Sequence, residues 1–272
     1  KHVDDKGFLR VQNVGGFDTR NLFARQVTVH TSKGDLLGLM NPGAKPIHLS
    51  TPDERNKVPV LAEFFIDTGL SSEAVKKQVR VGDPVTLQQE AKELGDFFTG
   101  KAMDDRVAVF VVLESLKQLK SKNLPYDVYA VFTTQEEVGL RGAVTSAYGV
   151  EPDIGIALDI TLASDLPGTP PDQAVTVMGN GVAIKVMDSY SISDRGLVQA
   201  LVDLAQKKKI TYQMEVLPLG GTDAGAIQRS RAGVPSITLS IPTRYVHTVT
   251  ECVHVDDVRA TIELLNAYLQ SS

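Results

Sequence analysis

The sequence predicts an α/β domain with a mixed, largely parallel sheet sandwiched by helices, preceded by a β-rich block. From about residue 100, apolar runs of strand length alternate with helical segments, which is the pattern of strands connected by helices. Residues 7 to about 87 contain short strand patterns, turn residues and only one short helical pattern. The change near residue 90 therefore separates two structurally different parts of the chain.

The β-rich block begins with a predicted hairpin, in which strands at residues 26–30 and 36–40 flank the turn-rich segment 31–35. Ser71 is the expected N-cap of a short helix over residues 71–78. The remaining expected elements are a long loop and two short strands, at residues 41–59, 64–67 and 79–81. Because the block holds no cluster of ligand-type side chains, we interpret it as a structural or assembly module.

The α/β part is predicted from its alternating apolar patterns. The expected helices cover residues 106–121, 143–148, 195–208 and 256–270, and the expected strands cover residues 128–133, 154–158, 212–217 and 236–241. Pro242 is expected to close the last strand. A tight glycine-rich loop at residues 220–225 is expected to lead into a further helix that ends near Arg231.

Composition excludes several classes of function. The chain of 272 residues has a formal net charge of −5 and no basic stripe, so nucleic acid is not an expected partner. No apolar run approaches the roughly 20 residues that span a membrane. The single cysteine, Cys252, excludes an intramolecular disulfide and fits the cytoplasm as the compartment. Since the chain opens on Lys1 without an initiator Met, we expect an N-terminal segment to be missing.

The most informative stretch is the predicted strand at residues 128–133 and the two carboxylates that follow it, Glu136 and Glu137. The run is rich in β-branched and aromatic residues, so it is expected to be a fully buried strand. Two carboxylates at the end of a buried strand are costly unless their charge is used. We therefore expect a metal centre, with one glutamate as ligand and the other as proton shuttle.

Other ligand-type residues are expected near the same sheet edge, because ligands of open α/β sheets bind outside the carboxyl ends of the strands. Carboxylate and imidazole together bind zinc, cobalt or manganese, and a site without thiolates is typical of catalysis. Two divalent ions need a bridging carboxylate. A carboxylate that binds no metal can move a proton. The candidates besides Glu136 and Glu137 are Asp104 and Asp105 before a helix, Asp159 and His247 after strands, and the pair His2 and Asp4 at the start.

Each candidate taken alone has an ordinary explanation. Asp104 and Asp105 could cap a helix, and Asp159 could form a turn at a strand end. Glu136 and Glu137 could be solvated loop residues. The joint pattern, and not any single residue, predicts the metal centre.

Six motifs occur in an order that closely resembles the tetrahedral (TET) aminopeptidase family, which includes glutamyl aminopeptidases and proteins named FrvX or endoglucanase. The resemblance covers essentially the whole chain. The motifs are HVDDKGF at residues 2–8, GKAMDDR at 100–106, TQEEVG at 134–139, ALDI at 157–160, GGTDAGA at 220–226 and PTRYVH at 242–247.

The resemblance implies two divalent metal ions per subunit, most often zinc or cobalt, with manganese as a further candidate. It also implies a cis peptide between the two aspartates at residues 104 and 105. The implied residues are Asp104 as the bridging ligand, His2 with Asp159 at one metal, Glu137 with His247 at the other, Glu136 as the general base, and Asp4 as the partner that orients His2.

The resemblance further implies that residues 7–93 form an inserted β-barrel-like dimerisation domain, while residues 1–6 and 94–272 form the catalytic domain. Dimers would assemble into a hollow tetrahedral dodecamer. Asp223 and Arg244 are the expected substrate-binding residues. Arg229, Arg231 and Arg244 are candidates for pairing with an acidic substrate side chain.

The expected function is a metal-dependent aminopeptidase that hydrolyses the N-terminal residue of short peptides through a metal-bridged hydroxide, with a glutamate as general base. One alternative is a glycoside hydrolase of the endoglucanase kind, which needs two carboxyl groups about 5–9.5 Å apart across the sugar bond. The other is a non-catalytic peptide-binding or assembly protein of the same fold.

Overall fold

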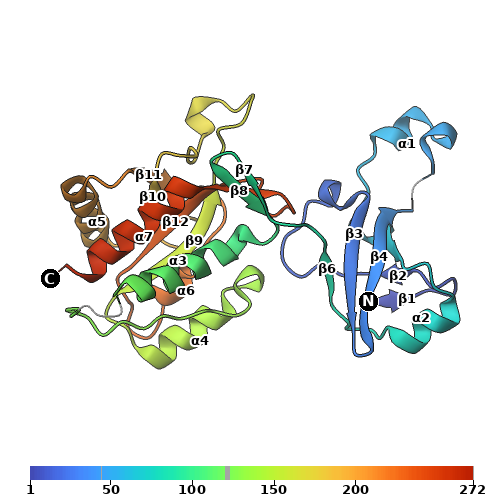
Figure 1. Cartoon of the computed structure of the whole chain (residues 1–272), viewed down its shortest axis with the longest axis horizontal. Helices are drawn as coiled ribbons and strands as arrows, with labels where there is room; N and C mark the ends of the chain where they lie inside the picture. Colours follow the sequence, from blue (N-terminus) through green and yellow to red (C-terminus); the bar gives the residue numbers. More distant parts are fainter. Residues whose placement is uncertain (44, 120–122, 272) are drawn as a thin grey trace. The chain divides into compact units, whose positions relative to one another are not determined.

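A computed structural model describes residues 1–43, 45–119 and 123–271. The chain forms two compact units. Residues 1–90 and 247–249 make up the β-rich unit, and residues 91–246 and 250–272 make up the α/β unit (Figure 1). The first six residues lie in the β-rich unit. Their predicted membership of the catalytic domain, and the insertion itself, stay predictions.

The β-rich unit is a six-stranded antiparallel sheet in the order β1-β2-β5-β4-β3-β6. Alternate residues such as Val27, Val29 and Ile66 are fully buried on one face, where they form the core of the unit. The strands are β1 (His2–Val3), β2 (Leu9–Arg10), β3 (Arg25–Thr31), β4 (Gly34–Pro42), β5 (Phe64–Asp67) and β6 (Val85–Leu87).

The predicted hairpin is present as β3 and β4, and the predicted helix as α2 (Ser72–Gln78) with Ser71 as its N-cap. The predicted strand at residues 79–81 is wrong. The N–H of Val79 closes α2 by donating to Val75, and the N–H of Arg80 donates to the carboxylate of Asp83. These bonds form a turn, and the next strand after α2 is β6.

The predicted long loop at residues 41–59 contains short helical segments, although its residue 44 lies outside the described residues. A 3-10 helix covers Ile47–Leu49, and α1 covers Pro52–Asn56. The side chain of Thr51 accepts the N–H of Glu54 and the side chain of Glu54 accepts the N–H of Thr51, which is a capping box. Thr51 and Glu54 have the spacing of a capping box in the sequence, but the proline and charged residues around them favoured the prediction of a loop.

The α/β unit is built on a seven-stranded mixed sheet, which confirms the predicted fold class. The longest ladders are parallel: β9 pairs with β12, and β10 pairs with β11. The order is β11-β10-β12-β13-β8-β7, with β9 beside β12. The strands are β7 (Lys92–Leu94), β8 (Phe97–Gly100), β9 (Gly155–Leu162), β10 (Val182–Met187), β11 (Tyr212–Val216), β12 (Ser236–Arg244) and β13 (Glu251–His254).

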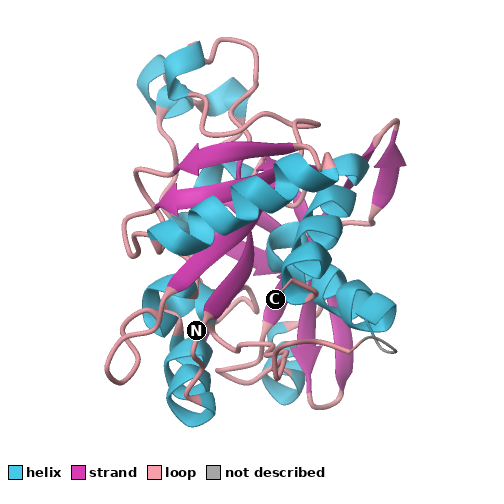
Figure 2. Cartoon of the chain, turned by 90° about the vertical axis from the view of Figure 1, so that its left-hand side faces the viewer, coloured by secondary structure: helices cyan, strands magenta, loops and turns pink. Residues whose placement is uncertain are grey.

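Helices cover both faces of this sheet (Figures 1 and 2). The main apolar core joins the sheet to α3 (Met103–Leu119), α5 (Arg195–Lys208) and α7 (Val255–Leu269). A smaller core joins the region of α4 (Arg141–Val150) and α6 (Ala224–Ile227). α5 matches its predicted bounds because Asp194 caps its N-terminus and Lys209 ends it in a left-handed conformation.

The predicted strand at residues 128–133 is wrong. Its backbone has no ladder partner, and β9 pairs only with β12 within the described residues. A strand is stable only where a neighbour satisfies its N–H and C=O groups. Without one, the expected buried side chains are exposed, Tyr129 by 68% and Phe132 by 51%. The sequence identified the strand propensity of this segment but not whether a partner was present.

Two strand ends also differ from the prediction. β9 continues to Leu162, so Asp159 lies within a strand instead of at its end. β12 continues through Pro242 to Arg244. Pro242 lies between the part of β12 that pairs with β10, which ends at Ser240, and the part that pairs with β13, which begins at Thr243. A proline without an N–H is tolerated at such a gap in the ladder.

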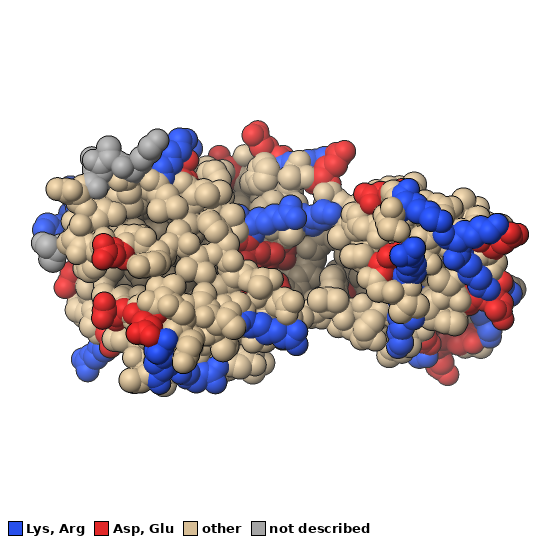
Figure 3. Space-filling model, turned by 90° about the horizontal axis from the view of Figure 1, so that it is seen from below, with Lys and Arg blue, Asp and Glu red and all other residues tan. Residues whose placement is uncertain are grey.

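The remaining helices agree with their predicted positions to within a few residues. For α3, predicted over residues 106–121, the positions 120 and 121 lie outside the described residues. Strands β7, β8, β10 and β13 of this unit were not predicted, and neither were β1, β2 and β6 of the β-rich unit. Among the described residues, no helix is long and apolar enough to cross a membrane. Figure 3 shows that one side of the α/β unit carries few charged side chains over a broad area.

Candidate metal centre

Three aspartates of the α/β unit bring their carboxylates together. Asp104 and Asp105 lie at the start of α3, and Asp159 lies in β9, where it is opposite Ser240 of β12. One carboxylate oxygen of each aspartate lies within 4.8 Å of the others. Asp104 and Asp105 have non-helical backbone angles, and the peptide between them is cis, as the resemblance implies. The resemblance implies a ligand role for Asp104 and Asp159, and the structure groups with them the carboxylate of Asp105, a candidate from the sequence.

Burial and mutual repulsion act strongly on this group. Burial, followed by the negative charges of Asp159, Asp104 and Glu136, raises the pKa of Asp105 to about 11. Burial, followed by the charges of Asp104 and Glu136, raises the pKa of Asp159 well above its ordinary value, although Lys185 and the N–H of Ile160 oppose the rise. Clustered carboxylates with raised pKa values are typical of functional sites.

Glu136 and Glu137 lie in a 3-10 helix, Glu136–Val138, on a sharply turned loop. Gln135 before it and Gly139 after it both have positive φ, and the N–H groups of Gly139 and Leu140 donate to the carbonyl of Glu136. A side chain at Gly142 would lie 2.4 Å from the backbone nitrogen of Thr134, so only glycine allows this close approach. The loop therefore fixes the backbone at both glutamates.

The two glutamates differ in their relation to the aspartates. A carboxylate oxygen of Glu137 lies within 4.8 Å of one of Asp104, so Glu137 can share an ion with Asp104. Glu136 belongs to neither acid group found among the described residues, but its charge raises the pKa of both Asp105 and Asp159. Glu136 is thus close enough to act on the cluster electrostatically without being one of its members.

The residues of this cluster fit divalent metal ions. Carboxylate oxygens suit zinc, cobalt and manganese. Asp105 Oδ1 is buried and has no hydrogen-bond partner, and a buried acceptor of this kind is costly unless a cation or donor meets it. Metal ions would replace the protons that the raised pKa values retain on the carboxyl groups.

His2, Asp4 and His247 belong to the β-rich unit. His2 lies in β1. Asp4 Oδ1 accepts the N–H groups of Lys6 and Phe8, each at 2.9 Å, and the predicted bond between Asp4 and His2 is not among its described contacts. Burial raises the pKa of Asp4, but the N–H groups of Phe8, Lys6 and Gly7 lower it more.

His247 has a positive φ and follows β12 in the chain, as predicted. Its imidazole Nδ1 would lie 3.3 Å from a side chain at Gly16, so that glycine leaves room for the ring. The ligand roles of His2 and His247 stay predictions.

Asp223, a predicted substrate-binding residue, precedes α6 and is half-buried. Its Oδ2 accepts a hydrogen bond from the hydroxyl of Thr133 at 2.6 Å, whereas its Oδ1 is buried without a partner. Burial raises the pKa of Asp223, and the Thr133 hydroxyl opposes this rise. Asp223 therefore offers one unused acceptor.

Arg244, the other predicted substrate-binding residue, is already paired. Its guanidinium donates to both carboxylate oxygens of Asp165 at 2.7 Å and lies over the ring of Phe97. Hydrogen bonding to Asp165 raises the pKa of Arg244. The bidentate pair fixes the segment after β9 against the end of β12. An acidic substrate side chain would have to displace Asp165.

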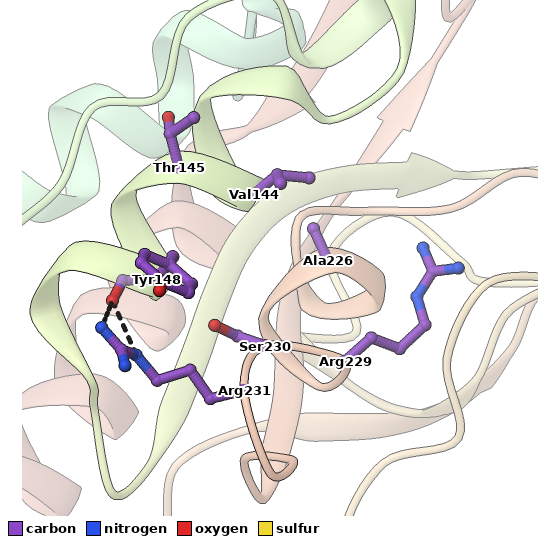
Figure 4. A pocket seen from close by; sticks show the side chains of 7 residues that line it. All are labelled: Val144, Thr145, Tyr148, Ala226, Arg229, Ser230 and Arg231. Atoms are coloured by element: carbon purple, nitrogen blue, oxygen red, sulfur yellow. Dashed lines mark hydrogen bonds between the residues drawn. The ribbon is translucent and has the colours of Figure 1, made fainter.

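The two other candidate arginines line an open cavity of about 600 Å³ between α4 and α6 (Figure 4). Arg231 donates to the carbonyl of Tyr148, lies 3.9 Å from the centre of its ring and pairs with Glu151. Arg229 donates to the carbonyl of Gly225. No predicted metal ligand lines this cavity, so it is separate from the acid cluster.

A buried ion pair behind the cluster was missed by the sequence reasoning. Lys185 of β10 lies 2.8 Å from Glu215 of β11 and 3.9 Å from Asp188, and all three side chains are fully buried. The hydroxyl of Thr161, two residues after Asp159, donates to Glu215 at 2.5 Å. The sequence offered one indication of this ion pair, which is that a charged residue interrupts the apolar run of each of the two strands.

Comparisons of the sequence and of the structure with known proteins agree on one family. The sequence matches the family described as M42 glutamyl aminopeptidase over residues 1–264. It is 36% identical over 265 residues to a protein named putative aminopeptidase from Acetivibrio thermocellus, with 97% of this chain and 76% of the relative covered.

Solved structures agree. An aminopeptidase from the archaeon Desulfurococcus kamchatkensis is 42% identical, with a TM-score of 0.93, and the match covers 100% of this chain and 75% of that one. The TET1 peptidase of Pyrococcus horikoshii is 31% identical, with a TM-score of 0.87 and coverage of 99% and 79%. That peptidase is described as assembling into a tetrahedron or a large octahedral shell.

Proposed function

Because the chain belongs to the M42 glutamyl aminopeptidase family, we propose that it is a dinuclear metallo-aminopeptidase that removes the N-terminal residue of short peptides. The observation that carries this proposal is the convergence of Asp104, Asp105 and Asp159 beside Glu136 and Glu137. Such a concentration of carboxylates is unfavourable unless cations neutralise it. A peptidase centre with two divalent ions uses this charge.

In the proposed site, Asp104 would be a ligand shared by both ions, His2 and Asp159 would hold one ion, and Glu137 and His247 would hold the other. Asp105 is a further candidate ligand because one of its carboxylate oxygens belongs to the same group and its Oδ1 is buried without a hydrogen-bond partner. When bound, two divalent ions supply Lewis acidity that polarises the peptide carbonyl and activates water. Zinc and cobalt are the proposed ions, and manganese is a third candidate.

Glu136 is the proposed general base. It takes a proton from the attacking water and delivers it to the amine that leaves when the peptide bond breaks. A base in this role should lie beside the ligand group without being part of it, and the electrostatic effect of Glu136 on Asp105 and Asp159 supports this.

Asp223 Oδ1 is the proposed acceptor for the free amino group of the substrate, because it is buried and has no donor in the described structure. An ammonium group would satisfy this oxygen and add a charge-assisted hydrogen bond. Arg244 would contribute to binding by holding the Asp165 segment, and it would contact an acidic substrate only by exchanging partners.

The β-rich residues 7–93 are the proposed dimerisation domain, and residues 1–6 and 94–272 the catalytic domain. We propose that dimers assemble into a dodecamer, and the tetrahedron described for the Pyrococcus horikoshii relative supports a tetrahedral assembly. Mass measurement in solution tests this proposal. The cytoplasm remains the proposed compartment, since the single cysteine, Cys252, is unpaired and buried.

Paired substitutions test the chemistry. Glu136→Gln should bind both metal ions as the unmodified protein does, while hydrolysis of an aminoacyl-nitroanilide falls by orders of magnitude, since only the proton carrier is lost. Glu137→Gln is the matched control on the same loop and should lower metal affinity as well as activity. Near-normal turnover of Glu136→Gln would refute the assigned base.

A glycoside hydrolase would behave differently. It uses two carboxyl groups across a sugar bond and needs no metal ion. Chelator-resistant hydrolysis of cellulose, without activity on aminoacyl-nitroanilides, would favour that function. A non-catalytic protein of this fold would hydrolyse neither substrate under any metal condition.

A further inference from the structure

The backbone of Asp104 is held by a side chain that the proposed mechanism does not use. Asp104 has φ −76° and ψ 103°, and Ala102 before it has a positive φ, so the chain leaves helical geometry where α3 begins. The N–H of Asp104 therefore needs an acceptor other than a helical carbonyl. It donates to Oε2 of Glu251 at 3.1 Å.

Glu251 is fixed in place by the sheet. It begins β13, where it is paired with Gly100 of β8, and the following residues of β13 pair with β12 on the other side. Its side chain is only 2% exposed. A carboxylate mounted on a strand with neighbours on both sides has little freedom to move, so it is a rigid acceptor for the N–H of Asp104.

Gly100 ends β8, where it pairs with Glu251 four residues before Asp104. A side chain at Gly100 would lie 2.9 Å from the end of the Met103 side chain and 3.2 Å from Ala91. The absence of a side chain at Gly100 leaves room for the Met103 side chain and for Ala91. The pairing of β13 with β8 therefore joins Glu251 to the turn that carries Asp104, in addition to the hydrogen bond.

We propose that Glu251 is a positioning residue that orients the Asp104 carboxylate in the metal centre by holding the Asp104 backbone. This inference rests on the proposed function, because Asp104 matters as a metal ligand only if the centre binds metal. Glu251 is not a member of the group formed by Asp104, Asp105 and Asp159. It acts on the centre through the peptide N–H of a ligand.

The chemistry of the position favours this role. Burying another carboxylate near three aspartates is costly, and a neutral acceptor could cap the turn at lower electrostatic cost. Metal ions in the centre would offset the added negative charge. Partners that orient a metal ligand in this way change metal affinity by roughly tenfold to a hundredfold when they are removed.

The test compares two substitutions of similar size. Glu251→Gln keeps a side-chain oxygen that accepts the N–H of Asp104, whereas Glu251→Met fills the space without such an acceptor. Cobalt binding is followed by calorimetry and by visible absorption, and thermal unfolding shows whether each variant is folded. We expect Glu251→Met to bind cobalt about 10–100-fold more weakly, with an altered absorption spectrum, and Glu251→Gln to stay within about threefold of the unmodified protein.

Asp257→Leu is the matched control. Asp257 is also fully buried and its carboxylate accepts two backbone N–H groups, from Gly179 and Gly181, but it lies on α7 and outside the acid cluster. Its loss should lower stability and leave cobalt affinity unchanged. A purely structural role for Glu251 would make the two variants behave alike.

The outcomes separate this inference from the proposed function. Failure of the unmodified protein to bind cobalt would overturn both. Normal cobalt binding by the protein and by Glu251→Met would overturn only the positioning role, as would equal losses in Glu251→Met and Asp257→Leu. If Glu251→Met does not fold, Glu251→Gln decides: unchanged affinity supports the role of the acceptor, and loss of affinity in the folded variant overturns it.

Discussion

The Asp105→Asn substitution tests the electrostatics of the acid cluster in protein from which metal has been removed. The pKa of Asp105 is about 11 in the folded chain and its ordinary value is 3.8. Between pH 5 and 8 the folded chain therefore keeps a proton on Asp105, whereas the unfolded chain has lost it. Because the native state binds one more proton, raising the pH destabilises it.

The expected magnitude follows from this difference of one proton. The free energy of unfolding should fall by about 1.4 kcal/mol per pH unit from Asp105 alone, or about 4 kcal/mol between pH 5 and 8. Asp159, whose pKa is also raised, should add a slope of the same sign. Asp105→Asn should remove only the Asp105 contribution.

The assay is urea unfolding of chelator-treated protein at pH 5, 6, 7 and 8, followed by circular dichroism. Asp172→Asn, which changes an exposed carboxylate on a distant 3-10 helix, is the control and should keep the slope of the unmodified protein. Parallel pH profiles for Asp105→Asn and the unmodified protein would refute the reasoning, because Asp105 would then carry no excess proton in the folded state.

Three further predictions follow from the same region. Lys185→Met should destabilise the protein by about 3–5 kcal/mol, because Glu215 and Asp188 stay buried without their cation. The double variant Lys185→Met with Glu215→Met should recover much of this loss, and equal urea midpoints for the single and double variants would contradict the prediction. Metal binding at pH 7 should release a proton from Asp105, so calorimetric heats should depend on the ionisation enthalpy of the buffer. Heats that do not depend on the buffer would argue against it. Thr133→Val should weaken inhibition by a small amine and leave cobalt affinity unchanged, since it removes only the hydroxyl that orients Asp223. An equal loss of amine inhibition and of cobalt affinity would contradict this, because it would show that the substitution disturbs more than Asp223.

The parts of the fold that could be predicted are those whose signals are local. The bounds of α5 follow from Asp194 at its start and from the chain reversal at Lys209. The β3–β4 hairpin follows from alternating residues around a turn. The segment 128–133 failed because strand propensity is local, whereas the ladder partner that buries a strand is not.

The candidate site was predictable as a set of residue types but not as an arrangement. The sequence associated Asp104 with Asp159, and the structure brings their carboxylates within 4.8 Å. It named Asp105 as a candidate without assigning it a place in the centre, and it did not single out Glu251, because both act through contacts between distant segments. The ion pair of Lys185 and Glu215 could not be predicted for the same reason, because the sequence does not show which charged residue of another strand lies opposite.

Metal-dependent removal of an N-terminal residue is the central claim, and one measurement tests it directly. Purified protein is assayed on a panel of aminoacyl-nitroanilides after chelation, and again after zinc, cobalt or manganese is returned, while bound metal is counted by mass spectrometry. We predict loss of activity on chelation and recovery as bound metal approaches two ions per chain. Full activity in metal-free protein, or no hydrolysis with both ions bound, would contradict the claim.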